Sequence, residues 1–556
     1  MLPAVLLIVL CVAAFARTTG HGFLFWDDRA FIPENRLIAH PSAGSLLALW
    51  TQPLFDLYAP LTYTLWALLS ALVGQPAPWL FHLTNVALHA LNACLVFALL
   101  RDLPGEADVG AALAGALVFA LHPIQVETVA WASETKDLLA GLLSLVAIRQ
   151  YLAFRARESR GAYVLASLAF GGALLSKPSA VVTPLLVLVL DRTLWRRRWR
   201  DALVAMGPWL VVAAMLTVIA AYAQPAKHTV APISLRPLVA LDALGFYGLK
   251  VLLPLQLAPD YGRTAERSWA TGVLIWSWIP AAVTLVTAWL LRRRLPALAA
   301  AVGLFCVSLL PVLGFVPFDF QYFSTVADHY VYLAMLGPAV GVTFACRQLP
   351  ATARTIAVAS AVTVLFVLSF RQAAHWKDDA TVAARTLAVN PRSFMAHNNL
   401  GQLLEERGRL DEALTHYRAA LEANPRDGDV LNNVGNVLFK AGRYDEAIRH
   451  YTGLLSAASP RTKIAARMHN NLGAAYLKTG RYDEAMTEFR GAIEIDPEYI
   501  EPYYNLGLVL TAFRRIDEAV RVLRDGLAIY PDHPALRQQL AIAMAGAAPP
   551  GSSVPR

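Results

Sequence analysis

The chain has 556 residues, and its 48 lysines and arginines outnumber its 40 aspartates and glutamates. This length indicates two or three domains instead of one hydrophobic core. Hydrophobic residues make up 56% of the chain and the mean hydropathy is +0.46, which excludes an ordinary soluble protein. Residues 376–556 hold 22 basic and 22 acidic residues, so the net charge of +8 lies in the apolar part and indicates membrane orientation, not nucleic-acid binding.

Residues 1–372 form an apolar region in which we expect a polytopic membrane helix bundle. Its long apolar runs predict about eleven spanning helices, at roughly 2–18, 79–100, 109–122, 137–154, 161–176, 178–191, 202–223, 273–291, 296–314, 329–346 and 354–370. Two further apolar segments, 60–74 and 238–256, are expected to lie in the membrane interface. The four cysteines fall in apolar runs without metal-ligand spacing, so we expect small buried side chains.

Short basic loops set the expected orientation. With the N-terminus inside, the inner loops include the arginine runs 196–198 and 292–294, as the positive-inside tendency requires. An odd number of spans then places the C-terminal part outside, on the same side as a long first outer loop, 19–78. We therefore expect an integral protein of a bacterial inner membrane or an endoplasmic-reticulum-type membrane, with its polar loops on the periplasmic or lumenal side.

The outer loops gather charged residues, and the first of them carries two adjacent carboxylates. Asp27 and Asp28 follow Trp26, shortly after the first apolar run. Carboxylates held against apolar surface are costly, so these two either lie in water at a loop turn or serve a chemical purpose. Later segments assigned to the same face carry Glu127, Lys136, Asp137, Lys177, Arg263, Asp328, His329 and Tyr330.

Each of these residues also has a structural interpretation. Asp137 and Asp328 open predicted helices, where an acid favours the positive end of the helix dipole. Lys136 and Lys177 are placed where a lysine can extend its apolar stem to the interface. A histidine such as His329 is more often a hydrogen-bonded structural residue than a metal ligand. The occurrence of all of them on one face, more than any single residue, favours a functional site.

Residues 376–545 contain an internal repeat. An Asn-Leu/Val-Gly motif recurs at 399–401, 433–435, 471–473 and 505–507, at intervals of 34, 38 and 34 residues, and Asp-Glu-Ala follows each copy in step. With a proline closing each unit, this period predicts four tetratricopeptide repeats at about 392–531, flanked by a half-repeat and a capping helix. The expected fold is thus all-α, a membrane bundle followed by an α-solenoid with a binding surface. The tail, 546–556, is expected to be disordered.

With both halves in view, the chain resembles the transmembrane and tetratricopeptide-repeat-containing protein O-mannosyltransferases and, more broadly, the GT-C membrane glycosyltransferases. The resemblance is carried by the repeats and by the segments 26–28, 60–62, 81–85, 122–137, 176–177, 258–261 and 327–332. It implies a hexose such as mannose, held on a polyprenyl phosphate at the outer face, and a serine or threonine hydroxyl of an exported protein as acceptor. Relatives often have Arg-Pro-Leu where this chain has Ala59-Pro60-Leu61, so another cation is expected to meet the lipid phosphate.

Inverting transfer from a lipid phosphate needs a carboxylate to accept the acceptor's proton and cations to stabilise the departing phosphate. We predict Asp27 or Asp28 as the base, because adjacent carboxylates resist ionising together and one pKa rises. The candidates for binding the donor phosphate or the acceptor are Lys136, Lys177, Arg263, His329, Glu127, Asp137, Asp328 and Tyr330. The residues identify no definite cofactor beyond the polyprenyl-phosphate-linked sugar as co-substrate; a divalent metal stays open, and Asp27 and Asp28 would be its ligands.

Other functions stay open at this point. The sugar could pass to a lipid or a cell-wall glycan instead of a protein, with the repeats serving assembly. The chain could also be a non-catalytic scaffold whose repeats gather envelope proteins and whose helices only anchor them. A transporter is disfavoured, because the ionisable residues lie at one face and not at mid-membrane.

Overall fold

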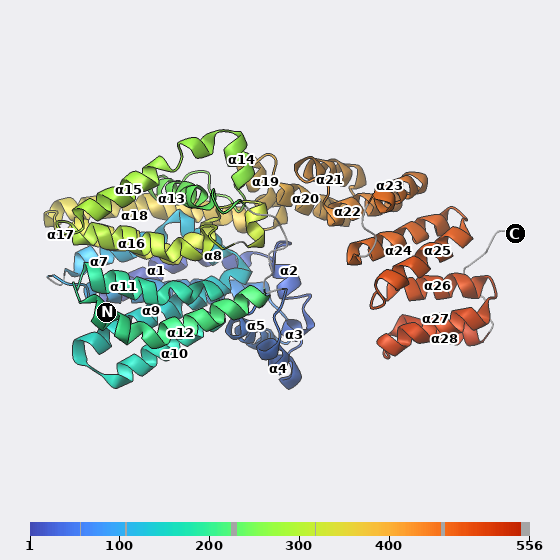
Figure 1. The fold of residues 1–556 in the computed structure, drawn as a ribbon, viewed down its shortest axis with the longest axis horizontal. Coiled ribbons are helices and arrows are strands. Elements are labelled where there is room, and N and C mark those ends of the chain that lie inside the picture. The colour runs from blue at the N-terminus through green and yellow to red at the C-terminus, as the bar shows by residue number, and fades with distance from the viewer. Residues whose placement is uncertain (56, 106–107, 224–230, 317, 458–461, 546–556) are drawn as a thin grey trace. The chain divides into compact units, whose positions relative to one another are not determined.

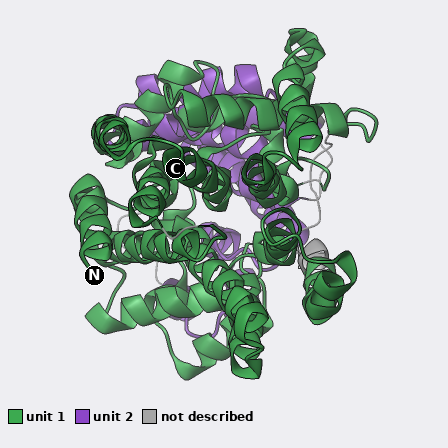
Figure 2. Ribbon diagram, turned by 90° about the vertical axis from the view of Figure 1, so that its left-hand side faces the viewer, with its two compact units in different colours: residues 1–396 green, residues 397–556 purple. Residues whose placement is uncertain are grey.

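The computed structural model describes residues 1–55, 57–105, 108–223, 231–316, 318–457 and 462–545, and the predicted disordered tail lies outside these ranges. The chain divides into two compact units, residues 1–396 and 397–556 (Figure 2). In the described residues every regular element is helical, apart from one isolated bridge between Leu54 and Leu57 (Figure 1). The all-α fold predicted from the sequence is confirmed.

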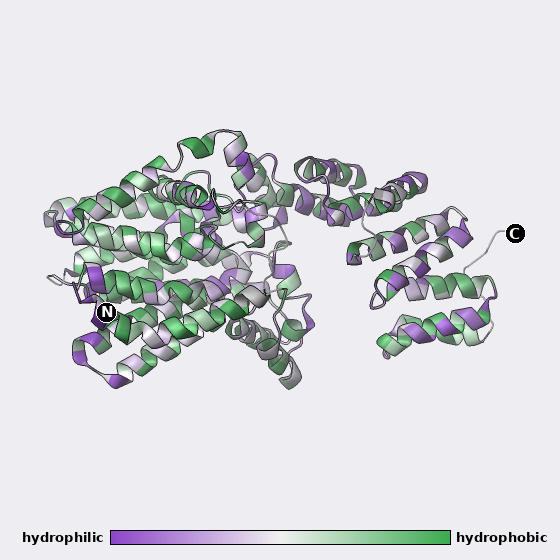
Figure 3. Cartoon of the chain, in the orientation of Figure 1, coloured by the Kyte–Doolittle hydropathy of each residue, from purple (hydrophilic) through white to green (hydrophobic). Residues whose placement is uncertain are grey.

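Unit 1 contains the apolar helices, which Figure 3 shows mainly in the hydrophobic colour. Six helices of the described residues are long and apolar enough to cross a membrane, and they centre on α1 (Leu2–Phe15), α6 (Pro78–Arg101), α9 (Thr135–Arg157), α12 (Trp199–Ala223), α15 (Ile279–Leu291) and α18 (Ala351–Ala373). A seventh is present if α7 (Val109–Leu121) and the segment Pro123–Ala130, which meet at a bend of 46°, form one span. These lengths agree with the predicted membrane bundle.

The number of long continuous helices is lower than the eleven apolar runs. Four apolar runs correspond to shorter helices, namely α10 (Arg160–Ser176), α11 (Thr183–Thr193), α16 (Pro296–Leu309) and α17 (Leu336–Arg347). Two of the breaks contain a proline, since Pro178 and Pro311 fall in the 3-10 turns Pro178–Val182 and Leu310–Val312; the 3-10 turns before α17, Asp328–Val331 and Leu333–Met335, contain none. A proline removes a backbone donor and interrupts the helix without making the sequence less apolar, so hydropathy does not register the break.

Helix α6 organises the interior of unit 1 through contacts with α1, α7 and α9. It contributes two fully buried polar side chains, His89 and Asn92, that both bond the Tyr332 hydroxyl, at 3.0 and 2.8 Å. His89 Nε2 also meets the Ala120 carbonyl at 2.9 Å, so this nitrogen donates and Nδ1 accepts from Tyr332. A polar group inside an apolar bundle costs free energy unless it is paired. The network therefore fixes the segment around Tyr332 against α6.

The segment 19–78, expected from the sequence to be the first outer loop, contains several short helices. It contains α2 (Asp28–Phe31), α3 (Arg36–Ala39), α4 (Ala43–Thr51) and α5 (Pro60–Val73). Their apolar side chains, with Tyr63 and Trp66 fully buried among them, form a small core of their own. The short helix that begins at Asp28 is thereby held in a defined place. The other segment expected at the interface, 238–256, is mostly helical as α13 (Arg236–Leu252).

Helix α19 (Asp379–Val389) belongs to unit 1, although the repeat pattern begins there in the sequence. Asp379 Oδ1 accepts the backbone N–H of Phe25 at 2.7 Å, and Asp379 Oδ2 lies 3.4 Å from Arg29 Nη2. Val382 is part of the apolar core of this unit. The boundary after Ala396 therefore leaves the first helix of the predicted repeat region attached to the loop that carries Asp27 and Asp28.

Unit 2 is a stack of antiparallel helix pairs. The pairs are α20 (Phe394–Glu406) with α21 (Leu410–Ala423), α22 (Gly428–Lys440) with α23 (Tyr444–Ala457), α24 (Lys463–Lys478) with α25 (Tyr482–Ile495), and α26 (Glu501–Ala512) with α27 (Ile516–Ile529); α28 (Pro534–Met544) follows. The motif glycine permits close packing within a pair, since a Cβ on Gly435 would lie 2.2 Å from the Tyr451 ring. The described residues of this unit thus form four helix pairs followed by one further helix.

Candidate active site

The two adjacent carboxylates of the first outer loop have different surroundings. The Asp27 side chain is 44% exposed. Asp28 is fully buried, and its two oxygens accept the backbone N–H groups of Leu24 at 3.1 Å and Ser133 at 2.8 Å. Asp28 thus ties its loop to the segment that precedes α9. Only Asp27 is placed to meet a substrate directly.

Burial raises the pKa of Asp28 from 3.8 to about 7, against the opposing effect of the two backbone donors. Repulsion from Asp27 adds to this rise but is a minor cause. The main cause of the raised pKa is therefore desolvation, which disfavours the charged form of a buried carboxyl, and not the adjacent charge expected from the sequence.

Asp27 is one member of a charged cluster built around Lys136 and Lys177. Lys136 Nζ lies 3.1 Å from Glu134 Oε1 and 3.5 Å from Asp27 Oδ2. Lys177 Nζ lies 2.5 Å from Asp137 Oδ2 and 3.7 Å from Glu134 Oε2. Glu134 therefore joins the two lysines, although it was not among the predicted site residues. Its sequence signal is its position directly before Thr135-Lys136-Asp137, at the start of α9.

Local structure explains why these side chains converge. Lys136 and Asp137 lie in the first turn of α9, and Glu134 ends the 3-10 turn Ala132–Glu134 just before it. Lys177 is the residue after α10, where the chain turns tightly into Pro178. Since α9 and α10 are antiparallel neighbours, the start of one meets the end of the other. The packing of α9 against α10 is what assembles the cluster.

A second group contains Glu127 and His329. Glu127 Oε1 lies 2.5 Å from His329 Nδ1 and also accepts the His329 backbone N–H at 3.3 Å. The Trp131 ring links this group to the lysine cluster, because its centroid lies 5.8 Å from the His329 ring and 5.7 Å from Lys136 Nζ. One continuous set of contacts therefore contains six predicted residues, namely Asp27, Glu127, Lys136, Asp137, Lys177 and His329.

The remaining predicted residues lie around that set and make other contacts. Asp328 is buried and accepts the Tyr261 hydroxyl at 2.7 Å, and burial raises its pKa from 3.8 to about 7. The ring of Tyr330 contacts the His329 ring at a centroid distance of 4.2 Å. Arg263 Nη2 is paired with Asp242 Oδ1 at 2.5 Å, so its charge is already compensated by a residue of α13. The structure therefore does not bring Arg263 into contact with the lysine cluster.

A divalent metal does not fit the pair Asp27 and Asp28. Both oxygens of Asp28 are occupied by backbone N–H groups, and Asp27 is turned to Lys136. Across the described ranges there is no group of three or more His, Cys, Asp or Glu side chains arranged to hold a metal ion. Hard divalent cations need several oxygen ligands directed at one point, and these two residues do not supply them.

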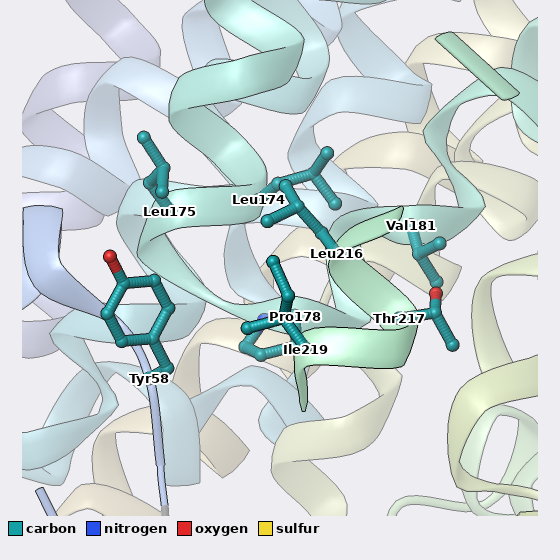
Figure 4. A pocket seen from close by; sticks show the side chains of 8 residues that line it. All are labelled: Tyr58, Leu174, Leu175, Pro178, Val181, Leu216, Thr217 and Ile219. Carbon is teal, nitrogen blue, oxygen red and sulfur yellow. The ribbon is translucent and has the colours of Figure 1, made fainter. Parts of the chain in front are cut away.

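An apolar cavity of about 20 Å³ lies where α10 ends and the chain turns into Pro178 (Figure 4). Leu175 and Pro178, the near neighbours of Lys177 in the chain, line it. Its other walls come from Tyr58, α10 and α12, with Leu216 and Thr217 facing Leu174 and Val181 across it. The space suits a methyl-sized branch and not a whole ligand.

Fold and site together define a polytopic helical membrane protein with a charged cluster at helix ends and a tetratricopeptide-repeat unit. Tetratricopeptide-repeat family models match residues 426–498 and 464–532, and another matches 365–428. The repeat assignment from the sequence is confirmed.

Curated relatives of this chain are protein O-mannosyl-transferases, as the resemblance predicted. One from Caenorhabditis elegans is 23% identical over 457 residues, which cover 75% of this chain and 62% of the relative. One from Homo sapiens is 25% identical over 476 residues, which cover 73% of this chain and 64% of the relative. One from Drosophila melanogaster is 35% identical over 162 residues, which cover 27% of this chain and 17% of the relative. The chain spans less than two thirds of the length of each of these relatives.

Proposed function

We propose that this protein is a GT-C-type glycosyltransferase that moves a hexose such as mannose from a polyprenyl-phosphate donor to serine or threonine hydroxyls of exported proteins. The observation that carries the proposal is Asp27, a half-exposed carboxylate 3.5 Å from Lys136. Its neighbours provide cations and an apolar surface at the ends of membrane-length helices. The similarity to protein O-mannosyl-transferases supports the same reaction.

In the proposed reaction Asp27 accepts the proton of the acceptor hydroxyl as that oxygen attacks the anomeric carbon. The new bond joins this carbon to the serine or threonine oxygen, and the bond to the phosphate oxygen breaks. Polyprenyl phosphate leaves with the bonding electrons, and one displacement inverts the anomeric centre. General-base catalysis of this kind contributes about 10²–10⁴-fold to the rate. Asp28 holds the Asp27 loop in place and touches no reacting atom.

Lys177 is our choice for the cation that stabilises the departing phosphate. Leu175 and Pro178 beside it line the apolar cavity, so a lipid chain on that surface brings its phosphate to Lys177. In the structure Lys177 is paired with Asp137. A phosphate that binds to Lys177 replaces the Asp137 carboxylate. A contact between the ammonium and the phosphate then takes the place of the contact between the ammonium and the carboxylate, and both are charge-assisted. Lys136 is left to orient Asp27.

The repeats of unit 2 are proposed to bind the acceptor protein or a partner that delivers it. Their first helices carry a regular row of amides: Asn471 Nδ2 donates to Asn432 Oδ1 of the preceding repeat at 3.0 Å, and Asn505 Nδ2 donates to Asn470 Oδ1 at 2.9 Å. Such amides keep donor and acceptor capacity for a peptide backbone.

Unit 2 and the lysine cluster are proposed to face the periplasm or lumen. A cysteine at exposed Ala423 would then react with an impermeant thiol reagent in sealed cells or right-side-out vesicles.

Comparison of glycopeptides tests the function in cells. Exported proteins from cells with and without this chain, complemented with the wild type or with Asp27→Asn, are analysed for hexose on serine and threonine. The proposal predicts that hexose is lost without the chain and is restored by the wild type alone. A change confined to lipid-linked or wall glycans would move the acceptor to those molecules. No change in either would favour a non-catalytic scaffold.

A further inference from the structure

In the described part of the chain, five buried polar atoms of residues 127–134, beside the lysine cluster, have no hydrogen-bond partner: Glu127 Oε2, Thr128 Oγ1, Trp131 Nε1, Ser133 Oγ and Glu134 Oε2. Glu134 Oε2 lies 3.7 Å from Lys177 Nζ, whereas Glu127 and Trp131, 3% and 5% exposed, offer an acceptor and a donor on larger side chains. An unpaired buried polar group costs about 1–3 kcal/mol, and native proteins rarely leave one without a water or a ligand. Glu127, in the short helix Val126–Ala130, and Trp131, the residue directly after that helix, therefore indicate a polar group that the chain itself does not supply.

The two atoms are held in place by the groups around them. The other oxygen of Glu127, Oε1, is bound to His329 through Nδ1 and the backbone N–H, which fixes the carboxylate plane. The Trp131 ring is stacked on Trp376 with centroids 5.7 Å apart and an interplanar angle of 29°. Trp26, the residue before Asp27, meets the same ring edge-on at 5.9 Å. These contacts position one acceptor, one donor and two indole rings beside the proposed base.

We propose that Trp131, Glu127 and Trp26 form the subsite for the sugar ring of the donor. This inference rests on the proposed glycosyl transfer and assigns a role within the same site. A hexose hydroxyl both donates and accepts hydrogen bonds, so it satisfies the Glu127 oxygen and the Trp131 N–H. The phosphodiester of the donor has no proton to donate to the Glu127 oxygen. A purely apolar group would leave both atoms unpaired. The indole rings suit the C–H faces of a pyranose.

The test compares two probes, a short-chain polyprenyl phosphate and the same lipid carrying mannose, bound to purified full-length protein in lipid nanodiscs. Trp131→Phe keeps the aromatic ring and removes the N–H, and Glu127→Gln keeps the side-chain shape and removes the charged acceptor. Each variant is expected to reduce the preference for the mannose-bearing lipid by roughly tenfold. Affinity for the lipid phosphate alone is expected to stay at the wild-type value.

A matched control is available at Trp66. Its Nε1 is also buried without a partner in the described residues, but it lies in the separate core of the first outer loop. Trp66→Phe should leave the preference unchanged. Wild-type preference in both Trp131→Phe and Glu127→Gln would overturn the subsite, because the sugar would then bind elsewhere. Transfer activity of the wild type is measured in the same preparation, so failure of the proposed function is seen separately from failure of this assignment.

Discussion

Substitution of Asp27 by Asn separates the roles of the two adjacent acids. Asp27 is 44% exposed, and its ion pair with Lys136 spans 3.5 Å. A partly exposed pair of this kind contributes about 0–1 kcal/mol to stability, so the thermal unfolding of Asp27→Asn should match that of the wild type. As the proposed base, however, Asp27 contributes about 10²–10⁴-fold to the rate. The variant should therefore fold normally and lose at least about a hundredfold in kcat.

The assay uses purified protein in nanodiscs, a mannose-bearing polyprenyl phosphate and an acceptor protein. Initial rates give kcat and the KM for the donor, and thermal unfolding is measured on the same samples. Glu34→Gln is the matched control, since Glu34 is an exposed carboxylate of the same loop and should change neither quantity. A kcat for Asp27→Asn within about threefold of the wild-type value would refute the assignment of Asp27 as the base.

Three further predictions concern stability. Burial raises the pKa of Asp28 to about 7, so its contribution to folding stability is present below pH ~4 and is lost as the pH rises through about 7. Relative to the variant Asp28→Asn, the wild type should lose on the order of 4 kcal/mol of unfolding free energy over this range. Thermal unfolding at a series of pH values measures this loss. Asp379→Ala should lower the unfolding free energy of unit 1 by about 1–3 kcal/mol and reduce activity, because the backbone N–H of Phe25 loses its acceptor. An unchanged rate of hydrogen exchange at the Phe25 amide would contradict this prediction. Gly435→Ala should destabilise the repeats by about 1–3 kcal/mol, because the new Cβ would collide with the Tyr451 ring. Gly453→Ala is the control and should not destabilise them, because a Cβ at Gly453 meets no atom within 4 Å. Equal unfolding temperatures for the two variants would contradict the packing described.

The repeat unit is the part that the sequence predicts best. The spacing of Asn399, Asn433, Asn471 and Asn505, with a glycine two residues after each, is a local pattern that repeats without reference to the rest of the fold. Each glycine has a direct physical reason, the close approach of an aromatic or leucine side chain such as Tyr451. A pattern set by contacts within a repeat can be read from a single sequence.

The charged cluster could be predicted in composition but not in its pairings. Asp27 and Asp28 are adjacent, and nothing in their identity says which is buried. Which of the two is buried depends on Ser133, 105 residues further along the chain, whose backbone N–H donates to Asp28. Glu134 was passed over for a similar reason, because its role as the link between Lys136 and Lys177 exists only when α9 and α10 lie side by side.

Two other features depend wholly on tertiary structure. Asp379 lies in a stretch that reads as the start of the repeats, yet it binds the loop of Asp27 through Phe25. Trp131 is one of 13 tryptophans in an apolar chain, and only its unpaired N–H beside Glu127 distinguishes it. Sequence periodicity reports which side chains share a face of one helix, and it does not report which groups remain without a partner after packing.

The most direct test of the central claim is transfer by the purified protein to a defined hydroxyl. An acceptor protein identified in cells is incubated with polyprenyl phosphate carrying labelled mannose, beside the same acceptor with its modified serine or threonine replaced by alanine. Our account predicts label on the intact acceptor only, in the inverted anomeric configuration, together with release of polyprenyl phosphate. Label on lipid or glycan in place of the protein, or no transfer with a folded wild-type protein, would contradict it.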